Sequence, residues 1–223
     1  MIAVILSGGR GNRLKPITDY FPKSLIPINN KPIIEWQIKY LKNFGIKNII
    51  ISAGYKNDQI KNFLKTKKNL GVSIRYSVEE TPLGTGGAIK KASKLIKEKS
   101  FFVINGDIIT NIDLRKLKSK MNSIAAIELR TKFGVLNTMN GKVIGFDEKN
   151  KIKNLWMNAG IYHLSKNIIR DLPLRGNIET TTFPRYAKNG NLNLIKFENA
   201  KWHSIDSYKD IEECSKQVTK IIK

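Results

Sequence analysis

The sequence predicts an α/β fold with a doubly wound, mostly parallel sheet and a more antiparallel second half. In the first 120 residues, apolar runs of strand type alternate with segments that carry apolar residues at helical spacing. Strands that alternate with helices favour a parallel sheet with right-handed crossovers. After about residue 120 the apolar runs become shorter, and the Asn-Gly pair at 140–141 predicts a hairpin turn.

The first half is expected to begin with a strand over residues 2–7 (IAVILS), which ends at a glycine-rich loop. Residues 32–45 show helical periodicity, and the helix is expected to end at Gly45, because glycine is a common residue at helix C-termini. The expected elements then continue in the order strand, helix, strand, helix, strand over residues 47–54, 57–65, 72–78, 83–98 and 101–106.

The second half is expected to contain shorter strands over residues 123–130, 134–139 and 142–149. After them we expect, in order, a strand over 157–164, a helix around 177–189, a strand over 192–197 and a terminal helix from 207 to about 222. No stretch has the composition of a linker, a repeat or a low-complexity segment. We therefore expect a single domain over residues 1–223, with halves 1–120 and 121–223 and no β-helix domain.

The composition indicates a globular protein with a strongly basic surface. Lys and Arg number 40 against 18 Asp and Glu, which gives a net charge of +22, and 41% of the residues are hydrophobic. The lysines are scattered along amphipathic segments and form no basic block. We therefore expect no nucleic-acid partner, and instead a basic surface around a small substrate that carries phosphate.

The sequence also bears on location. No apolar run approaches the ~20 residues that span a bilayer, so no membrane partner is expected. Residues 2–6 are too short for the core of a signal peptide and follow no basic region. The single cysteine, Cys214, excludes a disulfide framework and a cysteine metal cluster within one chain. We expect a cytoplasmic protein.

Residues 6–27 (LSGGRGNRLKPITDYFPKSLIP) crowd glycines and cations into the loop after the first strand. A dinucleotide loop requires G-x-G-x-x-G, but Leu14 stands at the third glycine position, and the second strand ends without an acidic residue. The P-loop pattern G-x-x-x-x-G-K-[ST] does not occur in the chain. A loop with Arg13 and Lys23 can offer backbone N–H groups to a triphosphate while its side chains neutralise charge.

This stretch resembles the signature of sugar-1-phosphate nucleotidyltransferases, L-x-G-G-x-G-T-R-L-x-P followed by P-K-x-L-x-P, with Asn12 where threonine is common. Members of this family join a nucleoside triphosphate to a sugar 1-phosphate and release pyrophosphate. The resemblance implies a Rossmann-like fold of the nucleotide-diphospho-sugar transferase type, with the nucleotide bound by residues 1–120 and the sugar phosphate by residues 121–223. It implies that the nucleotide is bound in this loop by Leu6, Gly8, Gly9, Gly11, Arg13 and Lys23.

A second motif of the family lies between the third predicted strand and the helix that follows. Residues 79–88 (EETPLGTGGA) resemble the segment E-x-x-P-L-G-T-[AG]-G-A, which contacts the nucleotide base. The resemblance implies nucleotide-binding roles for Glu79, Gly84 and Thr85. Closely spaced glycines let the backbone approach a flat heterocycle, which fits this role.

The second half carries shorter motifs that resemble the sugar-phosphate elements of the family. Residues 132–135 (KFGV) resemble Y-G-V, residues 148–149 resemble E-K, and residues 158–162 (NAGIY) resemble N-A-G-[IV]-Y. An acidic residue at position 179 lies where relatives contact sugar hydroxyls. The resemblance therefore implies that the sugar phosphate is bound by Gly134, Glu148, Lys149, Asn158 and Glu179.

A Mg²⁺ cofactor is expected at two aspartates. Asp107 resembles the family's G-D aspartate and follows a predicted parallel strand, at the end where ligands of such sheets gather. Many relatives supply the second ligand from W-x-D-I-G-T-x-x-D, but this chain has Ser204 in that place and Asp206 two residues later. Residues i and i+2 of a strand point to the same face, about 7 Å apart, so we expect Asp206 to hold the metal.

The neighbours of Asp206 have other expected roles. The variant W-x-x-[IM]-D-[ST]-x-x-D also resembles that of glucose-1-phosphate cytidylyltransferases. Asp210 is expected at the N-terminus of the last helix, where the helix dipole stabilises a negative charge. His203 is expected to be a surface or packing residue.

The resemblance implies a reaction in which Arg13, Lys23 and Asp107 are catalytic. A phosphate dianion is already a nucleophile at neutral pH, so no general base and no covalent intermediate are expected.

We expect GTP and mannose 1-phosphate as substrates. A uridylyl- or cytidylyltransferase acting on glucose 1-phosphate or a related sugar phosphate is an alternative, and a non-catalytic regulatory subunit that binds nucleotide sugars is an alternative of another class. Homo-oligomerisation stays open.

Overall fold

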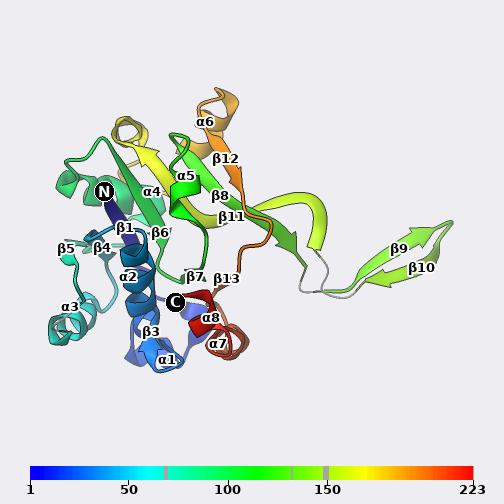
Figure 1. Cartoon of the computed structure of the whole chain (residues 1–223), viewed down its shortest axis with the longest axis horizontal. Coiled ribbons are helices and arrows are strands. Elements are labelled where there is room, and N and C mark those ends of the chain that lie inside the picture. The colour runs from blue at the N-terminus through cyan, green and yellow to red at the C-terminus, as the bar shows by residue number, and fades with distance from the viewer. Residues whose placement is uncertain (68–69, 132, 148–150, 223) are drawn as a thin grey trace.

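The structure, a computed structural model, describes residues 1–67, 70–131, 133–147 and 151–222. A seven-stranded sheet forms its centre, with the strand order β12-β8-β11-β6-β1-β4-β5 (Figure 1). These strands are β1 (Ile2–Ser7), β4 (Asn48–Ala53), β5 (Ser73–Val78), β6 (Ser100–Asn105), β8 (Ser123–Arg130), β11 (Lys151–Ser165) and β12 (Asn193–Lys196).

The sheet is parallel on one side and largely antiparallel on the other. β1 pairs in parallel with β4 and with β6, and β4 pairs in parallel with β5. β11 runs antiparallel to both β6 and β8, while β12 is parallel to β8. The expectation of a doubly wound, mostly parallel sheet with a more antiparallel second half is confirmed.

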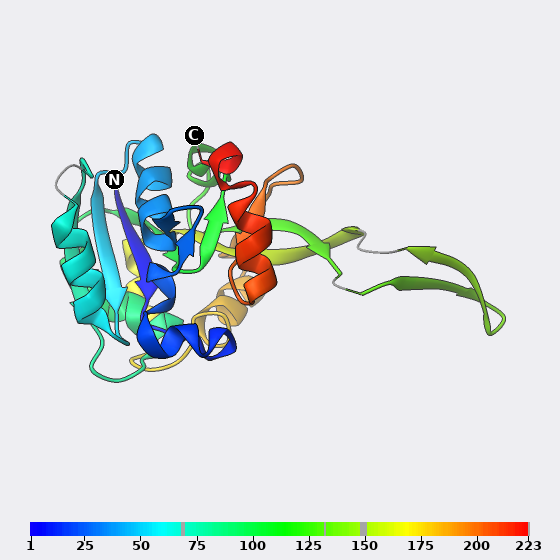
Figure 2. The same ribbon diagram turned by 90° about the horizontal axis from the view of Figure 1, so that it is seen from below.

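Helices cover both faces of this sheet (Figures 1 and 2). The longer helices are α2 (Ile33–Asn43), α3 (Asn57–Thr66), α4 (Gly84–Ala92), α6 (Thr182–Lys188) and α7 (Tyr208–Ser215). Ala3 and Ile5 of β1 belong to the apolar cluster that includes α2, α3 and α7, whereas Ile2 and Val4 belong to the cluster that includes α4 and α6. The alternation of side chains along β1 therefore builds a core on each side of the sheet.

Short elements connect these layers. The helical ones are α1 (Ile17–Tyr20), α5 (Leu114–Leu117), α8 (Val218–Ile221) and the 3₁₀ turns η1 (Asn12–Leu14), η2 (Lys23–Leu25), η3 (Ser93–Leu95) and η4 (Lys166–Asp171). The short strands form two antiparallel pairs, β2 (Pro27–Ile28) with β3 (Lys31–Pro32) and β7 (Ile108–Thr110) with β13 (Trp202–Ser204). None of the described helices is long and apolar enough to cross a bilayer.

Several expected boundaries differ from the observed ones. The helix expected over 83–98 ends at Ala92, where Ser93 Oγ donates to the Lys90 carbonyl at 2.7 Å and competes with the helical pattern. The expected terminal helix is divided into α7 and α8, because a turn with Gln217 N donating to the Cys214 carbonyl interrupts it. β11 is longer than the strand expected over 157–164, since it pairs with two neighbours.

A two-stranded hairpin projects far from the body of the molecule (Figures 1 and 2). It consists of β9 (Val135–Met139) and β10 (Lys142–Asp147), which pair only with each other among the described strands. Asn140 and Gly141 both have positive φ, 49° and 74°, as a type I′ turn requires. The hairpin that the Asn-Gly pair predicted is therefore present.

Candidate active site

Two adjoining cavities open where β1 and β6 end. The first has a volume of about 480 Å³ and is lined by the glycine loop after β1, by the segment 79–88 and by the end of β6. The second has a volume of about 570 Å³ and lies against β8, β11 and β13. Both cavities are lined by Arg13, Asn105, Asp107 and Asp206. These four residues mark the junction at which a ligand in one cavity would meet a ligand in the other.

The glycine loop forms one wall of the first cavity. Gly11 adopts the left-handed conformation with φ 67°, and its carbonyl accepts hydrogen bonds from Leu14 N at 2.9 Å and Thr18 Oγ1 at 3.1 Å. A Cβ at Gly8 would lie 2.5 Å from Glu79 Oε1. A side chain at position 8 would therefore displace the carboxylate of Glu79, which lies against the backbone.

Glu79 presents a fixed carboxylate to the first cavity. It is 9% exposed, and its oxygens accept hydrogen bonds from Ser52 Oγ at 3.1 Å and from Leu83 N at 3.2 Å. Each carboxylate oxygen has a further lone pair, so the group keeps acceptor capacity for a ligand. Gly84, with φ 72°, begins α4 beside it and packs against the backbone of Gly176.

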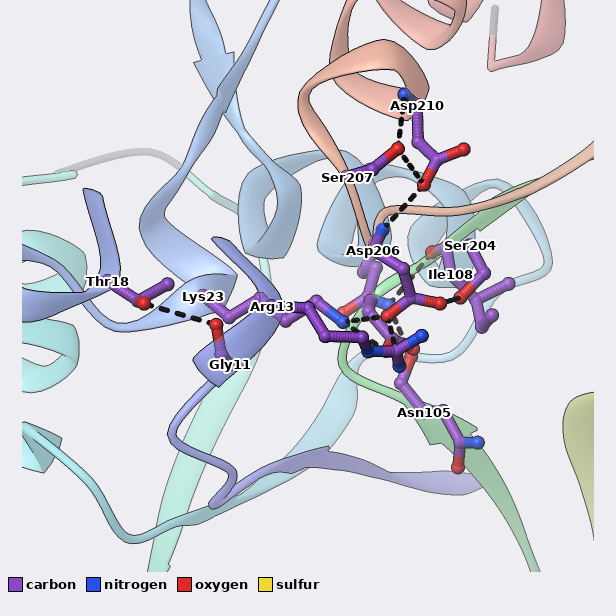
Figure 3. A network of polar contacts seen from close by, with 12 residues as sticks. Gly11, Arg13, Thr18, Lys23, Asn105, Ile108, Ser204, Asp206, Ser207 and Asp210 are labelled. Carbon is purple, nitrogen blue, oxygen red and sulfur yellow. Dashed lines mark hydrogen bonds and ion pairs between the residues drawn. The ribbon is translucent and has the colours of Figure 1, made fainter. Parts of the chain in front are cut away.

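A cluster of two cations and two carboxylates occupies the junction of the cavities. Figure 3 shows Arg13 and Lys23 of this cluster beside Asp206. Lys23 Nζ lies 2.6 Å from Asp107 Oδ2 and 2.8 Å from Asp206 Oδ1. Arg13 Nη2 lies 2.7 Å from the same Asp206 oxygen. The side chain of Arg13 is 75% exposed, whereas that of Lys23 is 16% exposed. The ammonium group of Lys23 is therefore largely shielded from solvent between two carboxylates, whereas the guanidinium group of Arg13 is free to turn towards solvent.

The backbone explains why the two aspartates meet. Asp107 follows β6, and its carbonyl accepts a hydrogen bond from Ile205 N at 3.0 Å. β7 and β13 pair antiparallel next to it, with Ser204 opposite Ile108. This pairing brings position 206 beside Asp107. The geometry allows Asp206 to take the place of an aspartate at position 204, and this role stays a prediction.

Ser204 has a role that the sequence did not reveal. Its Oγ donates to Asp206 Oδ2 at 2.8 Å, which leaves Oδ1 for the two cations. Burial raises the pKa of Asp206, but hydrogen bonds from Lys23 and Ser204 and the charges of Lys23 and Arg13 outweigh it, so the pKa is lowered overall. Asp206 therefore stays ionised.

Asp210 contacts the backbone of Asp206 rather than the two cations. Its Oδ2 accepts hydrogen bonds from Asp206 N at 3.0 Å and from Ser207 Oγ at 2.9 Å at the start of α7 (Figure 3). This agrees with the expected place of Asp210 at a helix N-terminus. Asp210 also lines the second cavity, as does His203.

A hydrogen-bonded chain runs behind the two cavities. Thr85 Oγ1 donates to Glu179 Oε2 at 2.5 Å, and Tyr162 OH donates to Glu179 Oε1 at 2.9 Å. Asn158 Nδ2 in turn donates to the Tyr162 hydroxyl oxygen at 2.9 Å. Thr85 lines the first cavity and Asn158 the second. Burial, and then the charge of Glu179, raise the pKa of Tyr162, so its hydroxyl stays a donor.

The predicted sugar-phosphate residues are only partly brought together. Asn158 lines the second cavity, whereas Glu179 lines neither cavity and lies behind both. Gly134 lies at the foot of the β9–β10 hairpin, where a Cβ would lie 2.4 Å from the Phe146 ring. Glu148 and Lys149 lie outside the described residues. The roles of these residues therefore stay predictions.

Other polar groups of the site were missed by sequence reasoning. Ser7, Ser24 and Asn105 line the first cavity, and their buried atoms Ser7 Oγ, Ser24 Oγ and Asn105 Oδ1 have no hydrogen-bond partner within the described part of the chain. Buried polar atoms without partners are uncommon, and these three belong to residues that line the cavity. The only sequence signal for Asn105 was its place before the Gly-Asp pair.

The donor set at the junction suits a hard divalent cation. No group of three or more His, Cys, Asp or Glu side chains that could hold a metal is found among the described residues. Mg²⁺ is usually held by one or two carboxylates together with water and substrate phosphates. Asp107 and Asp206 converge from two elements onto one cationic nitrogen, so the pair already surrounds a positive charge. The residues therefore fit Mg²⁺.

A sequence profile of the nucleotidyl transferase family matches residues 2–221. The chain belongs to this family. The expected resemblance to sugar-1-phosphate nucleotidyltransferases is confirmed, and the fold and motifs described above are those of a nucleotidyltransferase.

Individual relatives refine the comparison. The chain is 43% identical over 180 residues, 78% of its length and 80% of the relative's, to D-glycero-alpha-D-manno-heptose 1-phosphate guanylyltransferase of Campylobacter jejuni. It is 34% identical over 225 residues to mannose-1-phosphate guanyltransferase of Yarrowia lipolytica, covering 94% of this chain and 62% of that one. The solved structure of HddC from Yersinia pseudotuberculosis complexed with GMP-PN superposes with a TM-score of 0.78 at 30% identity, covering 97% of this chain and 98% of that one.

Proposed function

We propose that this nucleotidyltransferase is a sugar-1-phosphate guanylyltransferase that converts GTP and a manno-configured sugar 1-phosphate into the GDP-sugar and pyrophosphate. The observation that carries this proposal is the cluster of Lys23, Asp107 and Asp206 at the junction of two cavities, because the reaction must bring two phosphate groups together at one point. Guanylyltransferases recur among the relatives named above, which supports GTP as the nucleotide.

The preferred sugar in this proposal is D-glycero-α-D-manno-heptose 1-phosphate. The heptose enzyme of Campylobacter jejuni is the more similar of the two relatives, and its length is closer to that of this chain. Mannose 1-phosphate, the substrate expected from the sequence, has the same ring configuration and is the second candidate. The uridylyl and cytidylyl alternatives receive no support from these two relatives.

The reaction forms a bond between a sugar-phosphate oxygen and the α-phosphorus of GTP, and it breaks the bond from that phosphorus to the oxygen of the departing pyrophosphate. No proton needs to move, because the sugar phosphate attacks as a dianion. Lys23 is placed to neutralise the reacting phosphates, and the exposed Arg13 can follow the triphosphate and the pyrophosphate. A Mg²⁺ ion held by Asp107 and Asp206 would supply further charge neutralisation and alignment.

Glu79 is the proposed reader of the base. Guanine presents two adjacent donors, N1–H and the 2-amino group, and a carboxylate has two acceptor oxygens to receive them. Uracil and thymine present one N–H between two carbonyl oxygens, which would repel the carboxylate. The anchoring of Glu79 by Ser52 and Leu83 fixes its orientation before the nucleotide binds.

The remaining parts of this proposal concern the surroundings of the site. Asn158 and, through the hydrogen-bonded chain, Glu179 serve the sugar side, together with Gly134, Glu148 and Lys149 by resemblance. The chain acts as one domain in the cytoplasm as a homo-oligomer, with no nucleic-acid or membrane partner. The free thiol of Cys214, which is buried, suits such a reducing compartment.

A substrate panel tests the proposed function. Pyrophosphate release is measured with Mg²⁺, each of GTP, UTP, CTP and dTTP, and each of the heptose, mannose and glucose 1-phosphates. We expect the highest kcat/KM for GTP with the heptose phosphate. A preference for another nucleotide would overturn the guanylyl assignment, and binding without release across the panel would favour the non-catalytic alternative.

A further inference from the structure

The β9–β10 hairpin exposes an unusual amount of apolar surface. The residues from Phe133 to Phe146 are called the arm here. Its large apolar side chains are between 50% and 80% exposed, and they are Phe133, Leu136, Met139, Val143, Ile144 and Phe146. An isolated two-stranded hairpin is at best marginally stable in water. The arm therefore lacks the packing partner that such a sequence requires.

The pairing register places much of this apolar surface on one face. Leu136 lies opposite Phe146, and Thr138 lies opposite Val143. Leu136 and Thr138 share a face of β9, because residues i and i+2 of a strand do, and paired residues lie on the same face of a hairpin. The register shift between Val143 and Gly145 therefore leaves Val143 and Phe146 on that face as well, and the four side chains form a strip, called the apolar face here. The ring of Phe146 leans over Gly134, where a Cβ would collide with it, and so extends the strip towards the body. Met139 lies on the opposite face, paired with Lys142.

The distribution of charge between the arm and the rest of the chain indicates which kind of partner the arm binds. The chain carries a net charge of +22, and 26% of its residues are charged, but Lys142 is the only charged residue between positions 133 and 146. Two copies of so basic a chain repel each other over most of their surfaces, so they can approach best where the surface is apolar and nearly free of charge. Anionic membranes and nucleic acids would instead favour a basic arm.

The size of the arm also fits an interface. Its six apolar side chains together expose on the order of 600 Å² over both faces of the arm, against about 300–600 Å² for the largest apolar patch of a typical monomer and about 800 Å² per partner in a standard interface. We propose that the arm is a dimerisation element whose apolar face packs against the same face of a second copy of this chain around a two-fold axis. Such an isologous contact needs no other complementary surface.

The oligomeric state of variant chains tests this proposal. The wild-type chain is expected to sediment as a dimer, at twice the chain mass of 25.3 kDa. Leu136→Ser combined with Phe146→Ser removes the apolar face and is expected to give a monomer with an unchanged far-UV circular dichroism spectrum. Met139→Ser, an equally exposed apolar position on the opposite face, is the matched control and is expected to stay dimeric.

A crosslinking experiment keeps the apolar side chains in place. Cys214, the single cysteine of the chain, is buried and does not interfere. Thr138→Cys lies within the apolar face, and oxidation with copper–phenanthroline is expected to link two copies through it. Asn137→Cys, which points to the opposite face, is expected to give much less linked dimer.

Three results would overturn the proposal. The first is a wild-type chain that is monomeric at every concentration, and the second is a dimer that persists in the Leu136→Ser/Phe146→Ser variant. The third is binding of the wild-type chain, but not of this variant, to anionic phospholipid vesicles, which would assign the arm to a membrane. None of these outcomes depends on whether the guanylyltransferase proposal is correct.

Discussion

At the residue scale, the carboxylate that completes the junction comes from position 206, two residues after the position that the family motif uses. Serine occupies position 204, where many relatives have an aspartate, and Asp206 faces Lys23 and Arg13 instead. The hydrogen bond from Ser204 Oγ holds one oxygen of Asp206 and directs the other to the cations. A serine two residues before the carboxylate is therefore part of the arrangement.

Substitutions of Asp206 and Ser204 should separate the effect of the Asp206 charge from the effect of its orientation. Asp206→Asn is expected to lower kcat by about 100-fold or more, because loss of a carboxylate that holds charge in a phosphoryl-transfer site costs several kcal/mol. Ser204→Ala keeps the charge and loses one hydrogen bond of about 1 kcal/mol, so a decrease of less than about tenfold is expected. Pyrophosphate release at saturating substrate measures both. Equal losses in the two variants would contradict this division.

Glu79 gives a second prediction at the residue scale. Glu79→Gln replaces one acceptor oxygen by an NH₂ donor that would face a donor of guanine. We expect kcat/KM for GTP to fall by about 10- to 200-fold, which corresponds to about 1–3 kcal/mol, while kcat/KM for UTP falls less. Initial rates with both nucleotides measure the ratio. A variant that loses GTP and UTP activity equally would show that Glu79 only supports the loop.

At the element scale, the chain of hydrogen bonds behind the cavities joins α4, β11 and the segment before α6. Thr85 lies in the first turn of α4, Tyr162 and Asn158 lie on β11, and Glu179 precedes α6. Tyr162 is fully buried and packs its ring edge-on against Phe183 at 5.0 Å. Its hydroxyl contacts both Glu179 and Asn158, so it connects Asn158 on the second cavity with Glu179 and, through Glu179, with Thr85 on the first.

Removal of this hydroxyl tests the connection. Tyr162→Phe keeps the ring but removes one hydrogen bond from Glu179, which keeps its bond from Thr85, and one from Asn158, which keeps its bond from Gly160 N. We expect a cost of about 1–3 kcal/mol in the free energy of unfolding. We expect KM for the sugar 1-phosphate to rise more than KM for GTP. Tyr186→Phe is the matched control, because its hydroxyl donates to Asp171 at 2.7 Å away from both cavities. An equal rise of both KM values would indicate a general structural effect.

At the scale of the whole molecule, the net positive charge should increase the rate at which anionic substrates associate with the enzyme. A net charge of +22 attracts polyanionic substrates over a distance that salt controls, since the Debye length falls from about 30 Å at 0.01 M to about 8 Å at 0.15 M ionic strength. We expect kcat/KM for GTP to fall over this range while kcat, which does not include capture, changes less. Steady-state rates at constant free Mg²⁺ measure both, and a kcat/KM that does not depend on salt would contradict steering.

Sequence patterns predicted the main elements but not the contacts between distant ones. The continuous apolar run of β1 and the helical periodicity of α2 are clear signals, so both elements could be located from the sequence. β7 and β13 have three residues each, too few for a periodic signal, and form only because they pair with each other. The motifs identified Lys23 and Asp107, but their ion pair depends on tertiary folding and could not be predicted.

The pairing of β7 with β13 also has a consequence for the synthesis of the chain. Asp107 follows Lys23 by 84 residues, and Asp206 follows it by 183. A nascent chain on the ribosome therefore carries the glycine loop, Glu79 and Asp107 long before the strand that delivers Asp206 exists. The wall that would hold a nucleotide is made first, and the reacting centre is completed only when the last strand arrives. A prematurely terminated chain would lack that centre whatever its first half had folded into.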